Sequence, residues 1–203
     1  MMRTISFILF LLVITAVAVN AGEPSEEKQV RKGRFSFVLP KKWHAPWGKQ
    51  EQTRRGESAV LITKDGLMLD RIELRSRPIN ASFEYTKRVL QQGMQPFETA
   101  AVVVDDLQLN RTMKNLVIHE NKPATPCGKP GFRIVFSYTD NGTLQYKSVY
   151  YGFQQNNTFY TILYEAPTVH YFDTYLAVFE KIAGTIVLEG DRRDRDARKT
   201  ALP

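Results

Sequence analysis

Cysteine is almost absent from this 203-residue chain, in which Cys127 is the only one. A single thiol cannot form a disulfide within the chain, which excludes a disulfide-stabilised scaffold and a thiolate metal cluster. The surrounding Pro126-Cys127-Gly128 is typical of a turn, and no histidine lies nearby in sequence to lower the pKa of the thiol. We therefore expect an inert thiol in a loop or a partly buried position.

Histidine is equally scarce. The three histidines, His44, His119 and His170, lie far apart without the spacing of metal ligands. The sequence also lacks a Gly-x-Ser-x-Gly nucleophile elbow, a phosphate-binding loop and a dinucleotide fingerprint. We expect no metal site and no cofactor, and a non-enzymatic protein is favoured. The alternative is a hydrolase of a cell-envelope component, with His119 or His44 as its general base.

The N-terminus has the three-part order of a secretory signal. Arg3 supplies positive charge, residues 5–19 are almost wholly apolar, and Val19-Asn20-Ala21 fits a cleavage site. The apolar run is shorter than the roughly 20 residues of a membrane-spanning helix, and no later run is long enough. We expect residues 1–21 to be a cleaved signal peptide of an exported protein, periplasmic or secreted, with no transmembrane anchor after cleavage. A retained N-terminal anchor is the alternative.

Basic residues outnumber acidic ones, with 28 Lys and Arg against 21 Asp and Glu. The excess is concentrated between Lys28 and Arg55, where nine basic residues accompany one acid, Glu51. Such a segment can attract an anionic envelope component or an acidic protein, or it can be a solvated face that aids solubility. Export makes nucleic acid an unexpected partner.

Alternating apolar residues predict a mainly antiparallel sheet. Asp65-Gly66 is a strong hairpin signal, and short polar turns separate three consecutive runs near the C-terminus that form a meander. The expected strands are Arg34–Leu39, Ser58–Thr63, Leu67–Ser76, Met113–Glu120, Gly131–Tyr138, Leu144–Phe153 and Thr158–Tyr164.

Helical periodicity is strongest near the C-terminus. An aromatic and aliphatic stripe from Phe172 to Ile182 predicts a helix over Thr168–Ala183 that packs on the sheet. A second helix is expected from Phe83 to about Gln92. A third can begin at Pro96, although Val102-Val103-Val104 favours a strand there.

These elements predict an α+β fold with a sheet of about six to seven strands flanked by helices, which we place on one side of the sheet. A single domain is expected over residues 34–188. A flexible lead-in at residues 22–33 precedes it, and a disordered basic tail at residues 189–203 follows it.

Two tryptophans lie between lysines in the expected loop from Lys41 to Gln52. Aromatic side chains are enriched at interface centres, and clustered charge speeds and orients encounter. We therefore predict a binding surface here, the alternative being that both rings fill the end of the core. The predicted anchors are Trp43 and Trp47, and the predicted rim is Lys41, Lys42, Arg54 and Arg55.

Residues 35–43, Phe-Ser-Phe-Val-Leu-Pro-Lys-Lys-Trp, resemble the opening strand and Pro-x-x-Trp turn of PsbP-like exported domains. Phe159-Tyr160, Ala166-Pro167 and the following helix to Ile182 resemble their ending. The resemblance implies an antiparallel sheet flanked by helices and an accessory or binding role. With the export signal, it leads us to expect a binding or accessory module of the cell envelope.

Overall fold

The computed structural model describes residues 27–46, 56–141 and 143–191. Several predictions made from the sequence fall outside these ranges. They are the signal peptide at residues 1–21, residues 22–26 of the lead-in, Trp47, Arg54, Arg55, and the tail from residue 192.

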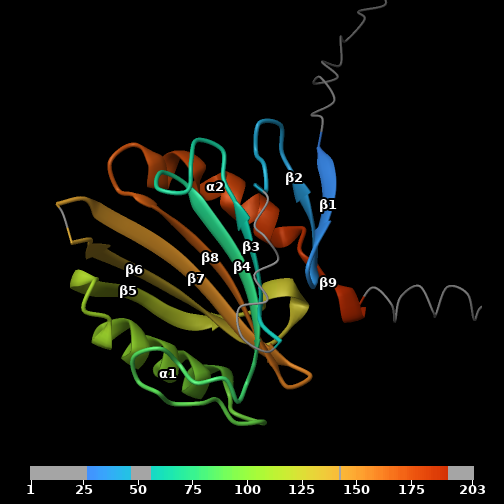
Figure 1. The fold of residues 1–203 in the computed structure, drawn as a ribbon, viewed down its shortest axis with the longest axis vertical. Coiled ribbons are helices and arrows are strands. Elements are labelled where there is room, and N and C mark those ends of the chain that lie inside the picture. The colour runs from blue at the N-terminus through green and yellow to red at the C-terminus, as the bar shows by residue number, and fades with distance from the viewer. Residues whose placement is uncertain (1–26, 47–55, 142, 192–203) are drawn as a thin grey trace, which may run out of the picture.

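The architecture is α+β, as predicted, with a large antiparallel sheet and a small one (Figure 1). The large sheet has the strand order β3-β4-β8-β7-β6-β5, so the meander β6-β7-β8 lies near its centre. Its strands are β3 (Ser58–Ile62), β4 (Arg71–Pro78), β5 (Lys114–Ala124), β6 (Gly131–Thr139), β7 (Gln145–Gln155) and β8 (Thr158–Pro167). The small sheet has the order β1-β2-β9, with β1 (Lys28–Lys32), β2 (Phe35–Leu39) and β9 (Val187–Leu188).

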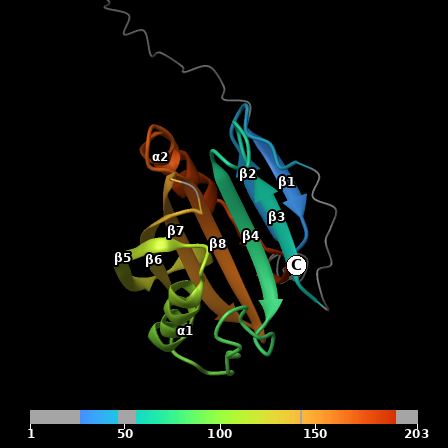
Figure 2. The ribbon, with the colours of Figure 1, turned by 60° about the vertical axis from the view of Figure 1, so that its left-hand side comes forward.

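Helices cover both faces of the large sheet. Helix α1 (Pro96–Leu109) contacts β5, β6 and β7 on one face, and α2 (Tyr171–Gly184) contacts β7 and β8 on the other, with the 3-10 helix η1 (Pro126–Gly128) beside it. Figures 1 and 2 show the two long helices on opposite sides. The prediction of helices on one side was wrong, because neighbouring β6 residues such as Ile134 and Val135 are buried in the cores of opposite faces.

The C-terminal helix packs on the sheet as predicted. Phe172, Phe179 and Ile182 of its stripe are buried, and Phe179 is 0% exposed. The small sheet shares this core through Phe35 and Phe37 of β2. The stripe is therefore core, in agreement with its helical spacing.

The segment before α1 does not form the expected helix. Two of its backbone amides, those of Tyr85 and Thr86, donate to the Asp106 carboxylate at 2.9 and 2.8 Å, and Lys87 has a positive φ of 58°. Bonds to α1 and a left-handed residue are incompatible with a regular helix there. By contrast, Pro96 does begin α1, and Val102 and Val103 are buried in a helix and not in a strand.

The folded part begins earlier than residue 34. Strand β1 lies inside the expected flexible lead-in and pairs with β2 from Lys28 opposite Leu39 to Lys32 opposite Phe35. Main-chain pairing does not require an apolar pattern, and lysines are common on edge strands. The first residues of the expected tail are also held, because the Glu189 amide donates to the Arg34 carbonyl at 3.0 Å.

Neither long helix in these described ranges has the length and apolar character to cross a bilayer.

Candidate functional site

The predicted basic loop follows β2 at one end of the molecule. Lys41 and Lys42 are exposed there, whereas Trp43 between them and the next strand is buried, with 8% of its surface accessible. The other predicted contact residues of this surface, Trp47, Arg54 and Arg55, lie outside the described residues. The structure therefore keeps the two lysines and Trp43 in one loop, but the lysines face solvent and Trp43 faces the core.

Trp43 fixes this loop to the core. Its ring meets Tyr175 of α2 edge-on, with centroids 5.6 Å apart, and it belongs to the core cluster around α2. The next residue, His44, exchanges two backbone hydrogen bonds with Thr63 at 2.9 and 3.0 Å. For Trp43 the structure favours a core position that supports the neighbouring lysines.

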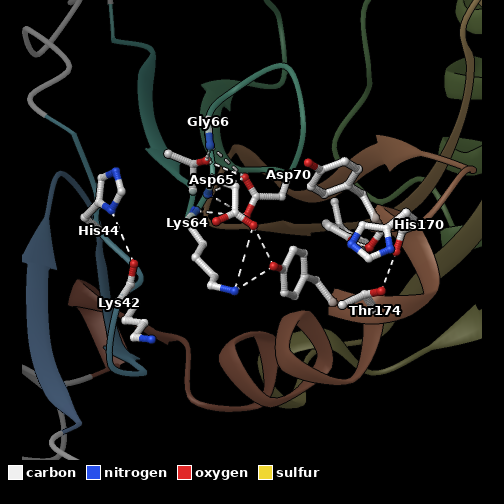
Figure 3. A network of polar contacts seen from close by, with 12 residues as sticks. Lys42, His44, Lys64, Asp65, Gly66, Asp70, His170 and Thr174 are labelled. Atoms are coloured by element: carbon white, nitrogen blue, oxygen red, sulfur yellow. Dashed lines mark hydrogen bonds and ion pairs between the residues drawn. The ribbon is translucent and has the colours of Figure 1, made fainter.

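The adjacent turn between β3 and β4 is held by one buried carboxylate (Figure 3). Asp70 is 0% exposed and accepts a hydrogen bond from the Thr63 hydroxyl at 2.6 Å. It also accepts bonds from the backbone amides of Lys64, Asp65 and Gly66 at 2.9, 3.0 and 3.1 Å. Such side-chain to backbone bonds replace regular secondary structure and fix the turn.

A second network joins this turn to α2. Lys64 Nζ donates to the Tyr175 hydroxyl at 2.6 Å, and that hydroxyl donates to Asp65 Oδ2 at 2.6 Å (Figure 3). The hydrogen bond to Asp65 raises the pKa of Tyr175, and the bond to Tyr175 raises the pKa of Lys64. The turn therefore presents a protonated lysine at neutral pH.

Exposed apolar side chains lie on the β3–β4 turn and on the loop between β8 and α2. Met68 is 72% exposed in the β3–β4 turn, and Val169 is 74% exposed between β8 and α2. The Tyr146 hydroxyl donates to the Met68 carbonyl at 3.3 Å, and the Thr168 amide donates to the Gln145 carbonyl at 2.8 Å. We call this region the loop end; it comprises residues 40–46, 63–70, 143–145 and 167–171 (Figure 1, top).

The exposure of Met68 and Val169 does not follow from the apolar pattern of the sequence. Met68 follows Leu67, so the pair was included in the strand expected from Leu67, but the Leu69 and Asp70 amides instead donate to the Gly66 carbonyl. Val169 was assigned to the start of the C-terminal helix, which begins at Tyr171. An apolar residue beside a turn signal, as at Asp65-Gly66, was the one available indication.

The histidines do not form a catalytic site with a carboxylate in the described part of the chain. His44 Nδ1 lies 3.4 Å from the Lys42 carbonyl oxygen, and His119 Nε2 lies 2.7 Å from the Ser137 hydroxyl. His170 contacts the Tyr171 ring edge-on. No cluster of three His, Cys, Asp or Glu side chains suitable for a metal ion occurs among the described residues.

Comparison with solved structures identifies the architecture. The chain superimposes on PsbP of Synechocystis with a TM-score of 0.52, at 11% identity over 83% of this chain and 95% of that one. The fold is PsbP-like. The same fold occurs in the Ran-binding protein Mog1p of Saccharomyces cerevisiae, with a TM-score of 0.52 at 8% identity over 81% and 96% of the two chains.

LpqN of Mycobacterium tuberculosis, which is involved in cell envelope biogenesis, shares the PsbP-like fold. Its TM-score is 0.51 at 12% identity, covering 83% of this chain and 87% of LpqN. No protein-family model matches the sequence, and no curated protein matches it. At these identities the likeness establishes the fold alone.

Proposed function

We propose that this chain is an exported, non-enzymatic binding or accessory module of the cell envelope, and that it docks on an envelope protein through the loop end. One observation carries the proposal. Met68 is exposed on the β3–β4 turn that Asp70 holds, and Val169 is exposed in the loop between β8 and α2, where the Thr168 amide donates to the Gln145 carbonyl. Apolar side chains exposed on a rigid frame mark interaction surfaces, and a pre-ordered surface loses less conformational entropy on binding.

The charge of the loop end suggests the chemistry of the partner. Lys41 and Lys42 are exposed at this end, Lys64 pairs with Asp65 at 3.8 Å, and the buried Asp70 carboxylate is occupied by its own turn. A partner surface with acidic groups around an apolar centre would complement it. Trp47, Arg54 and Arg55 extend this surface in our proposal, and Trp43 supports it from below.

Two kinds of support concern export and accessory function. The N-terminal signal pattern predicts a mature chain that begins at Gly22. LpqN is an envelope-biogenesis protein and Mog1p is a binding protein, so the PsbP-like fold is compatible with both parts of the proposal.

The test is a pull-down from envelope extracts of the native host. The bait is the wild-type chain or the double variant Met68→Asp, Val169→Asp, which places charge at both exposed tips. The matched control is Phe97→Asp, because Phe97 is 71% exposed at the start of α1, away from the loop end. A partner captured by wild type and control, lost with the double variant and weakened by moderate salt, would support the proposal.

A folded double variant that keeps the same partners would contradict docking at the loop end. Circular dichroism of each bait establishes that it is folded. Trp47→Ala extends the test to the predicted anchor, with loss of the partner again expected.

A further inference from the structure

A groove lies on the α1 face of the large sheet, where the helix does not cover β4 and β8. Helix α1 contacts β5, β6 and β7, so it lies over the other half of this face (Figure 2). The uncovered half forms a groove of about 590 Å³ that extends from Leu67 and Met68 to Arg77 and Phe83. We call it the sheet groove; its volume is that of sites for small organic ligands.

Strand β4 places arginine side chains in the sheet groove at alternate positions. Two of the three are neutralised within the protein. Arg71 pairs with Glu165 across the strands at 2.5 Å, and Arg75 pairs with Glu73 at 2.5 Å. These two cations have their counter-ions already.

Arg77 is the exception. No ion pair joins it to a carboxylate in the described part of the chain, and its buried Nη2 has no hydrogen-bond partner. Its guanidinium lies 3.8 Å from the centre of the Phe83 ring and 5.6 Å from that of Phe159. Burial lowers the pKa of Arg77, which shows that the site is poorly solvated for a cation.

The acids near Arg77 are already engaged or distant. Asp106 lines the groove, but its Oδ1 accepts from the amides of Tyr85 and Thr86 and from the Thr86 hydroxyl. Glu57 acts on Arg77 only through the longer-range field. A half-buried guanidinium without a counter-ion is costly in the free protein, and a bound anion would complete it with charge-assisted bonds.

Apolar and aromatic side chains line the sheet groove beside Arg77. Tyr150 is half-buried with its ring stacked on Phe132 at 6.1 Å, and Leu163 faces the same groove from β8. A ligand that places an anionic group at Arg77 would therefore lay its remaining part on apolar surface.

We propose that the sheet groove binds a small organic anion, a carboxylate or phosphate attached to an apolar body, with Arg77 holding the anionic group and Tyr150 and Leu163 beneath the apolar part. Arg77 would donate charge-assisted hydrogen bonds from the part of its guanidinium that lines the groove, in a planar geometry that a lysine cannot reproduce. The anion-binding part of this site lies apart from the loop end, because Arg77 lies at the opposite end of β4 from the β3–β4 turn, whereas the other end of the groove reaches Leu67 and Met68.

The probes are octanoate and octyl phosphate, titrated calorimetrically into the purified protein below their micelle concentrations. Acetate and inorganic phosphate supply the anionic group alone, and 1-octanol supplies the apolar body alone. At least one of the two octyl anions should bind, and each of the three partial probes should bind at least about tenfold more weakly. Tighter binding of octanoate would indicate a ligand with a carboxylate, and tighter binding of octyl phosphate a ligand with a phosphate.

Arg77→Met should weaken binding at least about tenfold, and Arg77→Lys should restore only part of it. The matched control is Arg31→Met, because Arg31 is exposed on β1 in the small sheet and should leave affinity unchanged. Backbone amide shifts in β4 and β8 should report the binding site. The proposal is overturned if neither octyl anion binds, if 1-octanol binds equally well, or if folded Arg77→Met binds as tightly as wild type.

Discussion

Asp70 links a single side chain to the shape of the loop end. It is fully buried, and its carboxylate accepts hydrogen bonds from the Thr63 hydroxyl and from three consecutive backbone amides. These bonds fix the turn in the conformation that exposes Met68. Trp43 acts in the same way for the preceding loop, through its contact with Tyr175. The exposed residues of the loop end therefore depend on buried ones.

Asp70→Asn should destabilise the protein by about 1–3 kcal/mol. The asparagine side chain has only one accepting oxygen, and its NH2 group would be buried next to backbone N–H groups that also donate. Urea denaturation measures the change in the free energy of unfolding. Asp65→Asn, at the more exposed neighbouring carboxylate, should cost less than about 1 kcal/mol. Equal losses for the two variants would show that Asp70 does not fix the turn.

Cys127 is a half-buried group whose environment has a defined consequence. Burial raises the pKa of its thiol to about 12, so thiolate is scarce at neutral pH. Since this folded-state pKa lies above the ordinary value of roughly 8.5, the neutral thiol favours the folded state, and its contribution is lost as pH rises from about 9 toward 12.

We therefore expect alkylation of Cys127 by iodoacetamide at about pH 8 to be at least about a hundredfold slower in the native protein than in concentrated urea. Mass spectrometry over time measures both rates. Comparable rates would mean that the thiol is accessible and ionised in the folded chain, contrary to its half-buried position within η1.

Individual elements differ in how far local sequence determines them. The meander and α2 were predictable because their apolar periodicity is local, as in the stripe containing Phe179. The loop around Tyr85 was not, since its conformation depends on Asp106 in the following helix. Strand β1 was missed because it is held by main-chain pairing with β2, which leaves no apolar pattern.

The candidate site, like the fold, was predictable only where its features depend on neighbouring residues in the sequence. Exposed Lys41 and Lys42 follow from a charged turn after Pro40. For Trp43 the sequence left a surface anchor and a core position open, because the choice depends on contact with Tyr175 in a distant helix. The pairing of Arg71 with Glu165 could not be inferred either, because it joins residues on two strands far apart in the chain.

The packing of helix α2 on the sheet predicts how a core substitution changes the free energy of unfolding. Phe179 is fully buried, with its ring stacked on Tyr164 at 5.1 Å and on Tyr151 at 6.1 Å. Phe179→Ala should reduce the free energy of unfolding by about 3–5 kcal/mol, since it removes a large core side chain and leaves a cavity. Phe97→Ala on exposed α1 surface is the control, with a change within about 0.5 kcal/mol. A loss below about 1 kcal/mol for Phe179→Ala would contradict the packing.

The whole molecule has two proposed surfaces on one PsbP-like frame, which meet at Leu67 and Met68. The loop end gathers turns from four parts of the chain, and the sheet groove occupies the half of the α1 face that the helix leaves uncovered. Both depend on the same central strands, β4 and β8, which pair along their full length. In our proposal the first surface recognises a protein and the second a small anion.

The most direct test of docking through the loop end is site-specific photocrosslinking in the native host. A photoreactive residue replaces Val169 in one strain and Phe97 in another, because both positions are similarly exposed but only Val169 belongs to the loop end. We predict a discrete crosslinked product with an envelope protein from position 169 and none from position 97. No product from position 169, or the same product from both positions, would contradict the proposed docking surface.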